Sequence, residues 1–312
     1  MATQDTVGTI ELAAERLSPH VRGGALRVLG GYWALTKPEV NFLILITTFA
    51  GFCLASKPAP DGLRIFLIIS TLLGTLLVAS GAGTVNQFLE RNFDAQMRRT
   101  ARRPIASGRI QPSHALWFGI SLSVAGTVYL ALAASVPASL LALATLLTYL
   151  FLYTPLKRKT PLCILIGAFP GAVPPLIGWA AARGRLDPEA WVLYAMVFLW
   201  QFPHFMAIAW MYREDYSGAG YLVLPLDKRR DRFVIWQSVA VSLALIPLSL
   251  LPTIVGESGL VYSVAALILG SIFFYYSARF AFQRSNVAAR QLLAASIVYL
   301  PAVFIAMMLN KK

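Results

Sequence analysis

The sequence predicts an all-α membrane protein, a polytopic helical bundle of about nine transmembrane helices around a central cavity. Of the 312 residues, 57% are hydrophobic and 13% are charged, whereas soluble domains average about 45–50% and about 25%. A single water-soluble core could not bury that much apolar surface. The apolar residues also occur in runs close to the length of about 20 residues that a helix needs to cross a bilayer. These observations argue against a soluble enzyme and against a disordered chain.

Nine apolar runs predict the nine spans, and none of them contains Asp, Glu, Lys or Arg. Because a charged side chain in hydrocarbon is costly, the absence of charges supports the boundaries. The first run is short, and we expect it to extend through residues 31–36 ahead of Pro38. The sixth contains Pro203, which is tolerated where a span lines a polar cavity. In order, the runs are Val40–Ala55, Ile65–Val85, Ala115–Ser135, Pro137–Tyr153, Leu162–Ala182, Ala190–Tyr212, Phe233–Leu251, Leu260–Ser277 and Leu292–Leu309.

The charge distribution predicts which side of the membrane each connection faces. Most of the 27 basic residues fall in the N-terminal segment and in the second, fourth, sixth and eighth connections. Because basic residues collect on the cytoplasmic side, we expect a cytoplasmic N-terminus and an external C-terminus. Residues 1–30 lack the apolar core of a secretory signal and are expected to be poorly ordered, with one intramembrane domain over 31–312. Their acidic residues favour a bacterial plasma (inner) membrane protein over a mitochondrial inner-membrane protein carrying a transit peptide.

The net charge of +13 has three candidate partners: nucleic acid, a membrane surface and a polyanionic substrate. The hydrophobicity of the chain argues against nucleic acid. The two cysteines, Cys53 and Cys163, are too few for a disulfide framework or a cysteine zinc site. The lipid bilayer and an anionic substrate therefore remain.

The second connection carries three oxygen-bearing side chains at four-residue intervals, Asn86, Glu90 and Asp94. No Pro or Gly occurs from residue 84 to residue 103, so we expect the second span to continue there as a helix. The three side chains would then share one face, and Arg98 would extend the same row. Such oxygen ligands suit Mg²⁺ that also binds substrate phosphates, and the arginines that follow would bind phosphate oxygens. A solvated helix face with charge pairs is the competing interpretation.

Two other connections on the same side add candidate groups. Glu214 and Asp215 form a second acidic pair at the expected depth of the first row, which would allow two metals to bridge one diphosphate. In the preceding span, His204 is a candidate haem ligand or acid–base group, or a histidine merely hydrogen-bonded within the bundle. In the fourth connection, Lys157 and Arg158 would either bind phosphate or only fix the topology.

Taken together, these segments resemble the UbiA superfamily of intramembrane prenyltransferases over nearly the whole chain. The superfamily's first acidic motif, N-x-x-x-[DE]-x-x-x-D, matches Asn86, Glu90 and Asp94. Its R-P-x-x-x-G ending matches residues 103–108. The basic loop that contacts diphosphate in the superfamily matches residues 153–160. In this order the motifs are highly specific.

Four segments are most similar to the branch of the superfamily that prenylates haem. They are residues 35–38 (LTKP), 171–179 (GAVPPLIGW), 200–205 (WQFPHF) and 212–216 (YREDY). In the quinone-forming relatives, the last segment reads D-x-x-x-D, whereas here Tyr212 and Tyr216 stand at its ends. Only Glu214 and Asp215 could supply carboxylate in this frame, so the first motif carries most of the prediction.

The resemblance implies a prenyltransferase with Mg²⁺ as its cofactor. It would transfer farnesyl from farnesyl diphosphate to a vinyl group of haem b with addition of water, giving haem O and diphosphate. It also implies the roles of the site residues: Asn86, Glu90 and Asp94 catalytic; these three and Asp215 binding Mg²⁺; Arg98, Arg103, Lys157 and Arg158 binding diphosphate; His204 binding haem. Contact with a downstream haem-modifying enzyme or a terminal oxidase is a further expectation.

Three other functions compete with this one. A membrane polyprenyltransferase acting on an aromatic acid in quinone biosynthesis would share the first motif but would be expected to carry D-x-x-x-D in the second. A transporter would place ionisable groups near the middle of the membrane, whereas here they lie at the span ends. A non-enzymatic assembly factor for a respiratory oxidase would need no diphosphate site.

Overall fold

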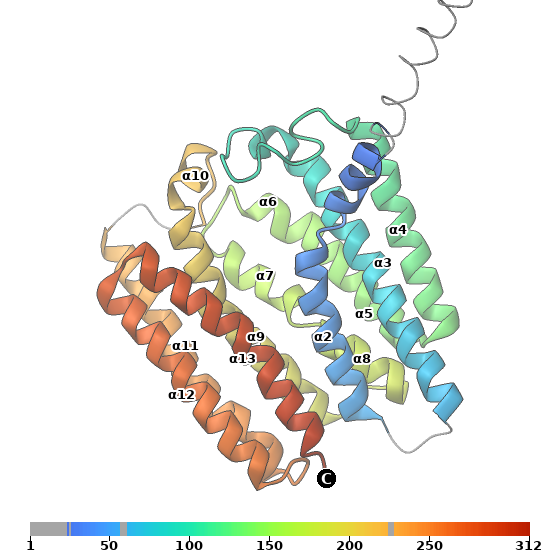
Figure 1. Ribbon diagram of the computed structural model, residues 1–312, viewed down its shortest axis with the longest axis vertical. Helices are drawn as coiled ribbons and strands as arrows, with labels where there is room; N and C mark the ends of the chain where they lie inside the picture. Colours follow the sequence, from blue (N-terminus) through green and yellow to red (C-terminus); the bar gives the residue numbers. More distant parts are fainter. Residues whose placement is uncertain (1–23, 25, 57–60, 224–227) are drawn as a thin grey trace, which may run out of the picture.

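The computed structural model describes residues 24, 26–56, 61–223 and 228–312, and within these ranges the chain is a bundle of helices (Figure 1). In the described part of the chain, nine helical segments are long and apolar enough to cross a membrane. Each contains or overlaps one of the nine predicted runs, so the predicted fold class is confirmed. Of the predicted N-terminal segment, residues 1–23 and 25 lie outside the described residues, and residues 26–35 are helical.

The bundle has two outer groups of helices and a third group between them. In Figure 1, α11, α12 and α13 form one side of the bundle and α3, α4 and α5 the other, with α2 and α7–α9 between them. The elements are α2 (Pro38–Ala55), α3 (Asp61–Asp94), α4 (Pro112–Ala133), α5 (Val136–Leu147), the π-helix η1 (Thr148–Tyr153), α6 (Thr154–Leu156), α7 (Cys163–Gly171), α8 (Pro174–Arg183), α9 (Pro188–Met211), α10 (Arg213–Gly218), α11 (Lys228–Ile254), α12 (Leu260–Gln283) and α13 (Asn286–Leu309).

The first span begins at Pro38 and does not extend through residues 31–36 as predicted. Lys37 has a left-handed backbone conformation, with φ of 53° and ψ of 60°, which breaks the chain into a helix over 26–35 and α2. Pro38 then starts α2, where its missing N–H costs no helical hydrogen bond. This break also sets the direction of the Lys37 side chain, which reaches α3.

The long helix α3 continues past the apolar run into the second connection, as predicted, but it ends at Asp94 and does not reach Arg98. Residues 95–111 form turns instead. The hydroxyl of Thr100 donates to the carbonyl of Asp94 at 2.9 Å, which satisfies a backbone acceptor at the helix end from outside the helix. The guanidinium of Arg103 binds the carboxylate of the same Asp94. Pro104 also disfavours helical conformation at the residue before it.

The predicted fifth span is two helices rather than one. The helix α7 ends at Gly171 and α8 begins at Pro174, with residues 172–173 between them. The side-chain amide of Gln201 on α9 donates to the carbonyl of Ala168 at 3.2 Å, an acceptor that also receives the backbone N–H of Ala172, so α9 is bonded to the last turn of α7.

Small residues let α2 and α8 approach closely. A Cβ atom on Gly178 would overlap the Thr48 carbonyl and crowd the Phe52 backbone nitrogen. Gly178→Ala should therefore lower the free energy of unfolding by about 1–3 kcal/mol, the usual cost of overpacking. Thermal unfolding in detergent measures this loss, with Gly218→Ala as the control because nothing lies within 4 Å of its added methyl. Equal melting temperatures for the two variants would contradict the close α2–α8 packing.

Candidate active site

The predicted row of oxygen-bearing side chains lies on the last turns of α3 and is buried. Asn86, Glu90 and Asp94 have exposed fractions of 1%, 6% and 1%. Burying a carboxylate is costly unless it is paired. The position is also unfavourable, because the C-terminal end of a helix carries partial negative charge. The carboxylates of Glu90 and Asp94 therefore lie where burial and the helix end both disfavour negative charge, as is typical of functional sites.

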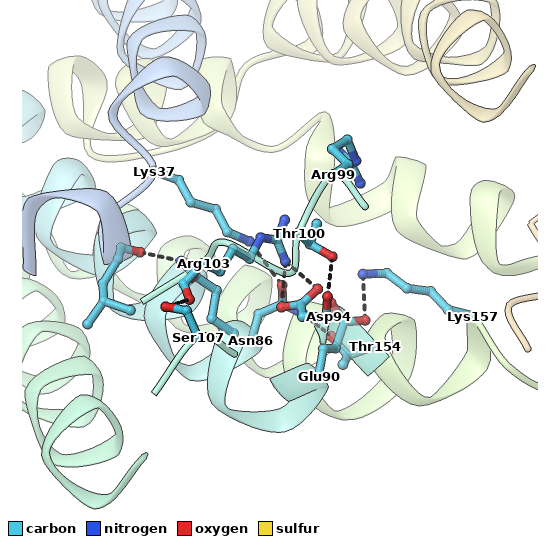
Figure 2. Close-up of polar contacts among 12 residues, drawn as sticks. Lys37, Asn86, Glu90, Asp94, Arg99, Thr100, Arg103, Ser107, Thr154 and Lys157 are labelled. Carbon is cyan, nitrogen blue, oxygen red and sulfur yellow. Dashed lines mark hydrogen bonds and ion pairs between the residues drawn. The ribbon is translucent and has the colours of Figure 1, made fainter. Parts of the chain in front are cut away.

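Three basic side chains, one from the N-terminal segment and two from different connections, contact this row (Figure 2). The Lys37 ammonium donates to Oδ1 of Asn86 at 3.0 Å, and the Lys157 ammonium donates to Oε1 of Glu90 at 2.9 Å. Nη1 of Arg103 lies 2.8 and 2.7 Å from the two carboxylate oxygens of Asp94. The sequence placed Arg103 and Lys157 at the site, and the structure brings both to it.

The cluster has more positive than negative charge. Three cations surround two carboxylates, and burial together with the neighbouring Arg103 and Lys157 lowers the pKa of Lys37 to about 7. A neighbouring anion would stabilise the protonated lysine. The site is therefore suited to bind an anion with several oxygens, such as a diphosphate.

Adjacent basic residues of the fourth connection differ in environment. The Lys157 side chain is 14% exposed, and its ammonium lies 4.5 Å from the centroid of the Tyr153 ring. Arg158 is exposed, and its guanidinium lies 4.4 Å from the centroid of the Phe93 ring. Of this pair, only Lys157 contacts the buried row.

The second acidic pair lies in a separate cluster with two arginines. Nε of Arg98 donates to Asp215 at 3.1 Å, and its Nη2 donates to Glu214 at 3.3 Å. The backbone N–H of Arg99 donates to the second oxygen of Asp215 at 3.2 Å. The prediction that Arg98 extends the helical row is wrong, because α3 ends four residues earlier. In the described part of the chain, no hydrogen bond or ion pair joins this cluster to Asp94.

The tyrosines of the second motif surround Arg99. Its guanidinium carbon lies 4.7 Å from the ring centroid of Tyr212 and 5.8 Å from that of Tyr216, and its Nη2 donates to the Tyr216 hydroxyl at 3.2 Å. The two tyrosines, which stand where the quinone-forming relatives are expected to have aspartates, therefore contact Arg99, a cation of the protein itself.

Arg98→Ala should change the affinity of the protein for diphosphate by less than about threefold. The Arg98 side chain is 81% exposed, and it pairs with Glu214, which is 77% exposed, and with Asp215, which is 10% exposed; ion pairs of so exposed a side chain contribute about 0–1 kcal/mol. Binding of inorganic diphosphate to the protein in detergent measures this effect. A loss comparable to that of a buried cation would show that the loop of residues 95–111 rearranges to bring Arg98 onto the substrate.

His204 packs within the bundle. Its Nδ1 lies 2.8 Å from the hydroxyl of Ser296, and its ring stacks on Trp200 with centroids 4.7 Å apart. Nε1 of Trp200 donates to the carbonyl of Ser296 at 2.8 Å. These contacts fix the ring and engage one nitrogen, and haem binding by His204 stays a prediction.

Two residues at the site were not among the predicted site residues. Lys37 was counted only as a charge that sets the topology and as part of the LTKP segment. Thr154, which accepts a hydrogen bond from Nδ2 of Asn86 at 3.1 Å, was matched only as part of the basic loop of residues 153–160 and given no role. A lysine directly before the proline that begins a span is a usable signal, because the break turns it toward the bundle.

The donor set fits Mg²⁺ that shares its coordination with a substrate. Among the residues that the structure describes, no three His, Cys, Asp or Glu side chains form a group that could hold a metal ion. Two carboxylates and one amide oxygen are nevertheless the ligand types of Mg²⁺, which keeps several positions for water and substrate phosphates. Asn86, Glu90 and Asp94 could hold such an ion.

The fold and the site define an integral membrane protein in which a buried cluster of two carboxylates, an amide and basic side chains lies at one end of a helical bundle. The chain belongs to the UbiA prenyltransferase family, whose model matches residues 44–306.

Several curated relatives are similar over most of the chain. The protoheme IX farnesyltransferase of Solibacter usitatus (strain Ellin6076) is 45% identical over 286 residues, which cover 90% of this chain and 98% of the relative. That of Koribacter versatilis (strain Ellin345) is 40% identical over 297 residues, covering 93% and 96%.

Solved structures share the fold at low sequence identity. A structure of digeranylgeranylglyceryl phosphate synthase has a TM-score of 0.74 and 18% identity, covering 90% of this chain and 98% of that one. A UbiA homologue from Archaeoglobus fulgidus bound to GPP and Mg²⁺ has a TM-score of 0.63 and 16% identity, covering 89% and 99%.

Proposed function

We propose that this chain is a Mg²⁺-dependent farnesyltransferase acting on protohaem IX. The bond between C1 of farnesyl and the diphosphate oxygen breaks, a vinyl carbon of haem b bonds to C1, and water adds to the other vinyl carbon. The products are haem O, diphosphate and a proton. The relatives named protoheme IX farnesyltransferase, which are 45% and 40% identical over about nine-tenths of the chain, support this substrate pair. We place the protein in the plasma membrane of a bacterium with its N-terminus in the cytoplasm.

The observation that carries the proposal is the buried row on α3 with its three cations. Diphosphate is a poor leaving group until its charge is neutralised, and preorganised cations in a water-poor site provide that stabilisation. Lys37, Lys157 and Arg103 would bind the diphosphate oxygens and stabilise the charge that grows as the C–O bond breaks. Mg²⁺ held by the α3 row would supply Lewis-acid neutralisation of the same oxygens when bound.

The apolar bundle serves the second half of the reaction. Loss of diphosphate leaves an allylic cation that bulk water would capture, so the site must exclude water until the vinyl group attacks. The site row is buried at one end of a bundle whose nine described spans have mean hydropathies of 1.5–2.4. Because the electrons come from the vinyl group of the acceptor, the chain needs no serine or cysteine nucleophile.

The test is product identification in membranes that contain the full chain. Incubation with farnesyl diphosphate, haem b and Mg²⁺ should give a pigment whose mass exceeds that of haem b by one farnesyl group plus one hydroxyl group. Samples without farnesyl diphosphate, and samples with a chelator, should give none. A prenylated aromatic acid formed from added 4-hydroxybenzoate, with haem b unchanged, would instead support the quinone-forming activity and refute this one.

A further inference from the structure

The fourth span ends in a π-helical turn next to the site. The turn η1 covers Thr148–Tyr153, and the backbone N–H of Thr154 donates to the carbonyl of Tyr149, five residues earlier. Pro155 explains the wide turn, because a proline ring collides with the carbonyl four residues before it in a regular α-helix. Such turns are rare and are often found at functional sites.

This turn places the Thr154 hydroxyl between two partners. The hydroxyl donates to the carbonyl of Tyr149 at 2.9 Å and accepts from Nδ2 of Asn86 at 3.1 Å. A carbonyl oxygen can only accept, so the single hydroxyl proton points to Tyr149. Toward Asn86 the hydroxyl therefore presents a lone pair, which can accept a hydrogen bond only from the N–H₂ end of the amide.

The other end of the same amide is fixed by a donor. The Lys37 side-chain nitrogen donates to Oδ1 of Asn86 at 3.0 Å, and it carries N–H donors whether it is protonated or neutral. Both neighbours thus require one orientation of the amide, with nitrogen toward Thr154 and oxygen toward Lys37. Figure 2 shows Thr154 and Lys37 on different sides of the α3 row. With Asn86 1% exposed, water does not compete for these contacts.

We propose that Thr154 is a positioning residue, which acts through Asn86 by holding its amide oxygen toward the metal and diphosphate. This role rests on the proposed function, in which that oxygen is a metal ligand. Without the hydroxyl, Nδ2 of Asn86 would be buried without its partner, and the contact of Oδ1 with Lys37 alone would hold the amide orientation. The π turn is the backbone feature that brings the hydroxyl of the fourth span to the second.

The test compares Thr154→Val with Thr154→Ser in the full chain. Mn²⁺ is titrated in the presence of farnesyl thiodiphosphate, a substrate analogue that does not ionise, and free Mn²⁺ is followed by its EPR signal. Loss of a partner that orients a metal ligand typically weakens metal binding by 10–100-fold, so Thr154→Val should raise the Kd for Mn²⁺ by about tenfold. The KM for Mg²⁺ in turnover should rise in parallel, and Thr154→Ser should stay within about twofold of wild type.

The matched control is Thr145→Val in the same span. The Thr145 hydroxyl donates to the carbonyl of Leu141 at 2.8 Å, so its loss removes a similar hydrogen bond away from Asn86. This control should bind Mn²⁺ like wild type. Thr154→Ala provides a second hydroxyl-free variant if valine prevents folding.

Two outcomes would overturn the positioning role: wild-type Mn²⁺ affinity in a folded hydroxyl-free variant, or equal losses in Thr154→Ser and Thr154→Val, which would assign the effect to packing. A wild-type chain that forms no farnesylated haem, but whose Mn²⁺ affinity falls in Thr154→Val and not in Thr154→Ser, would refute the proposed function and support the positioning role.

Discussion

Asp94→Asn should reduce turnover by at least about a hundredfold while leaving the protein folded in the membrane. The substitution keeps the shape of a side chain that is 1% exposed, but it removes one of the two negative charges in the row. It also removes the charge that Arg103 contacts with Nη1 at 2.8 and 2.7 Å. Product formed per amount of solubilised protein measures the loss.

The control for Asp94→Asn is Asn92→Ala, an exposed position near the end of the same helix. It should retain wild-type turnover. Gel filtration of both variants in detergent separates loss of chemistry from loss of fold. Normal product formation by a monodisperse Asp94→Asn protein would contradict the assignment of this carboxylate to metal and diphosphate binding.

The second large effect is expected from Lys157→Met compared with its neighbour Arg158→Met. Lys157 is partly buried, with 14% of its side chain exposed, and is paired with Glu90, so its removal leaves an unpaired buried carboxylate and takes a cation from the diphosphate. We expect the KM for farnesyl diphosphate to rise, and kcat/KM to fall by about 10²–10³-fold. Arg158 is exposed and contacts Phe93, so Arg158→Met should change kcat/KM by less than about threefold.

The sequence gives no reason to treat Lys157 and Arg158 differently, and these two variants distinguish their roles. Steady-state kinetics with varied farnesyl diphosphate at saturating Mg²⁺ supply the comparison. Equal losses in both variants would mean that the fourth connection binds substrate as a whole and that the difference in burial has no functional meaning.

The number of spans and the site row could be predicted because both depend on local patterns. A run of apolar residues long enough for the bilayer is read directly, and a four-residue interval places Asn86, Glu90 and Asp94 on one face of any helix that contains them. In the structure the three side chains do lie along one row, because α3 remains helical through Asp94.

What the sequence missed depends on contacts between distant segments. The end of α3 is set by Thr100 and Arg103 binding Asp94, which are contacts between turns that local propensity does not contain. The role of Lys37 depends on a backbone break that turns its side chain toward a helix 49 residues away in sequence. Thr154 reaches Asn86 only because of a π turn.

The contacts of the second acidic pair could not be predicted for a related reason. Its residues were assigned to the site by expected membrane depth and by their place in the YREDY segment, and neither fixes which side chain a carboxylate meets. In the structure Asp215 binds Arg98 and the backbone of Arg99, so the charges of this pair join two connections to each other.

The most direct test of the central claim is an experimental structure of the full chain with Mn²⁺ and farnesyl thiodiphosphate. The account predicts anomalous density for at least one cation bound to Oδ1 of Asn86 and to the carboxylates of Glu90 and Asp94, bridging to the diphosphate. The ammonium groups of Lys37 and Lys157 should lie on the diphosphate oxygens. Diphosphate bound elsewhere, with no cation density at the α3 row, would contradict it.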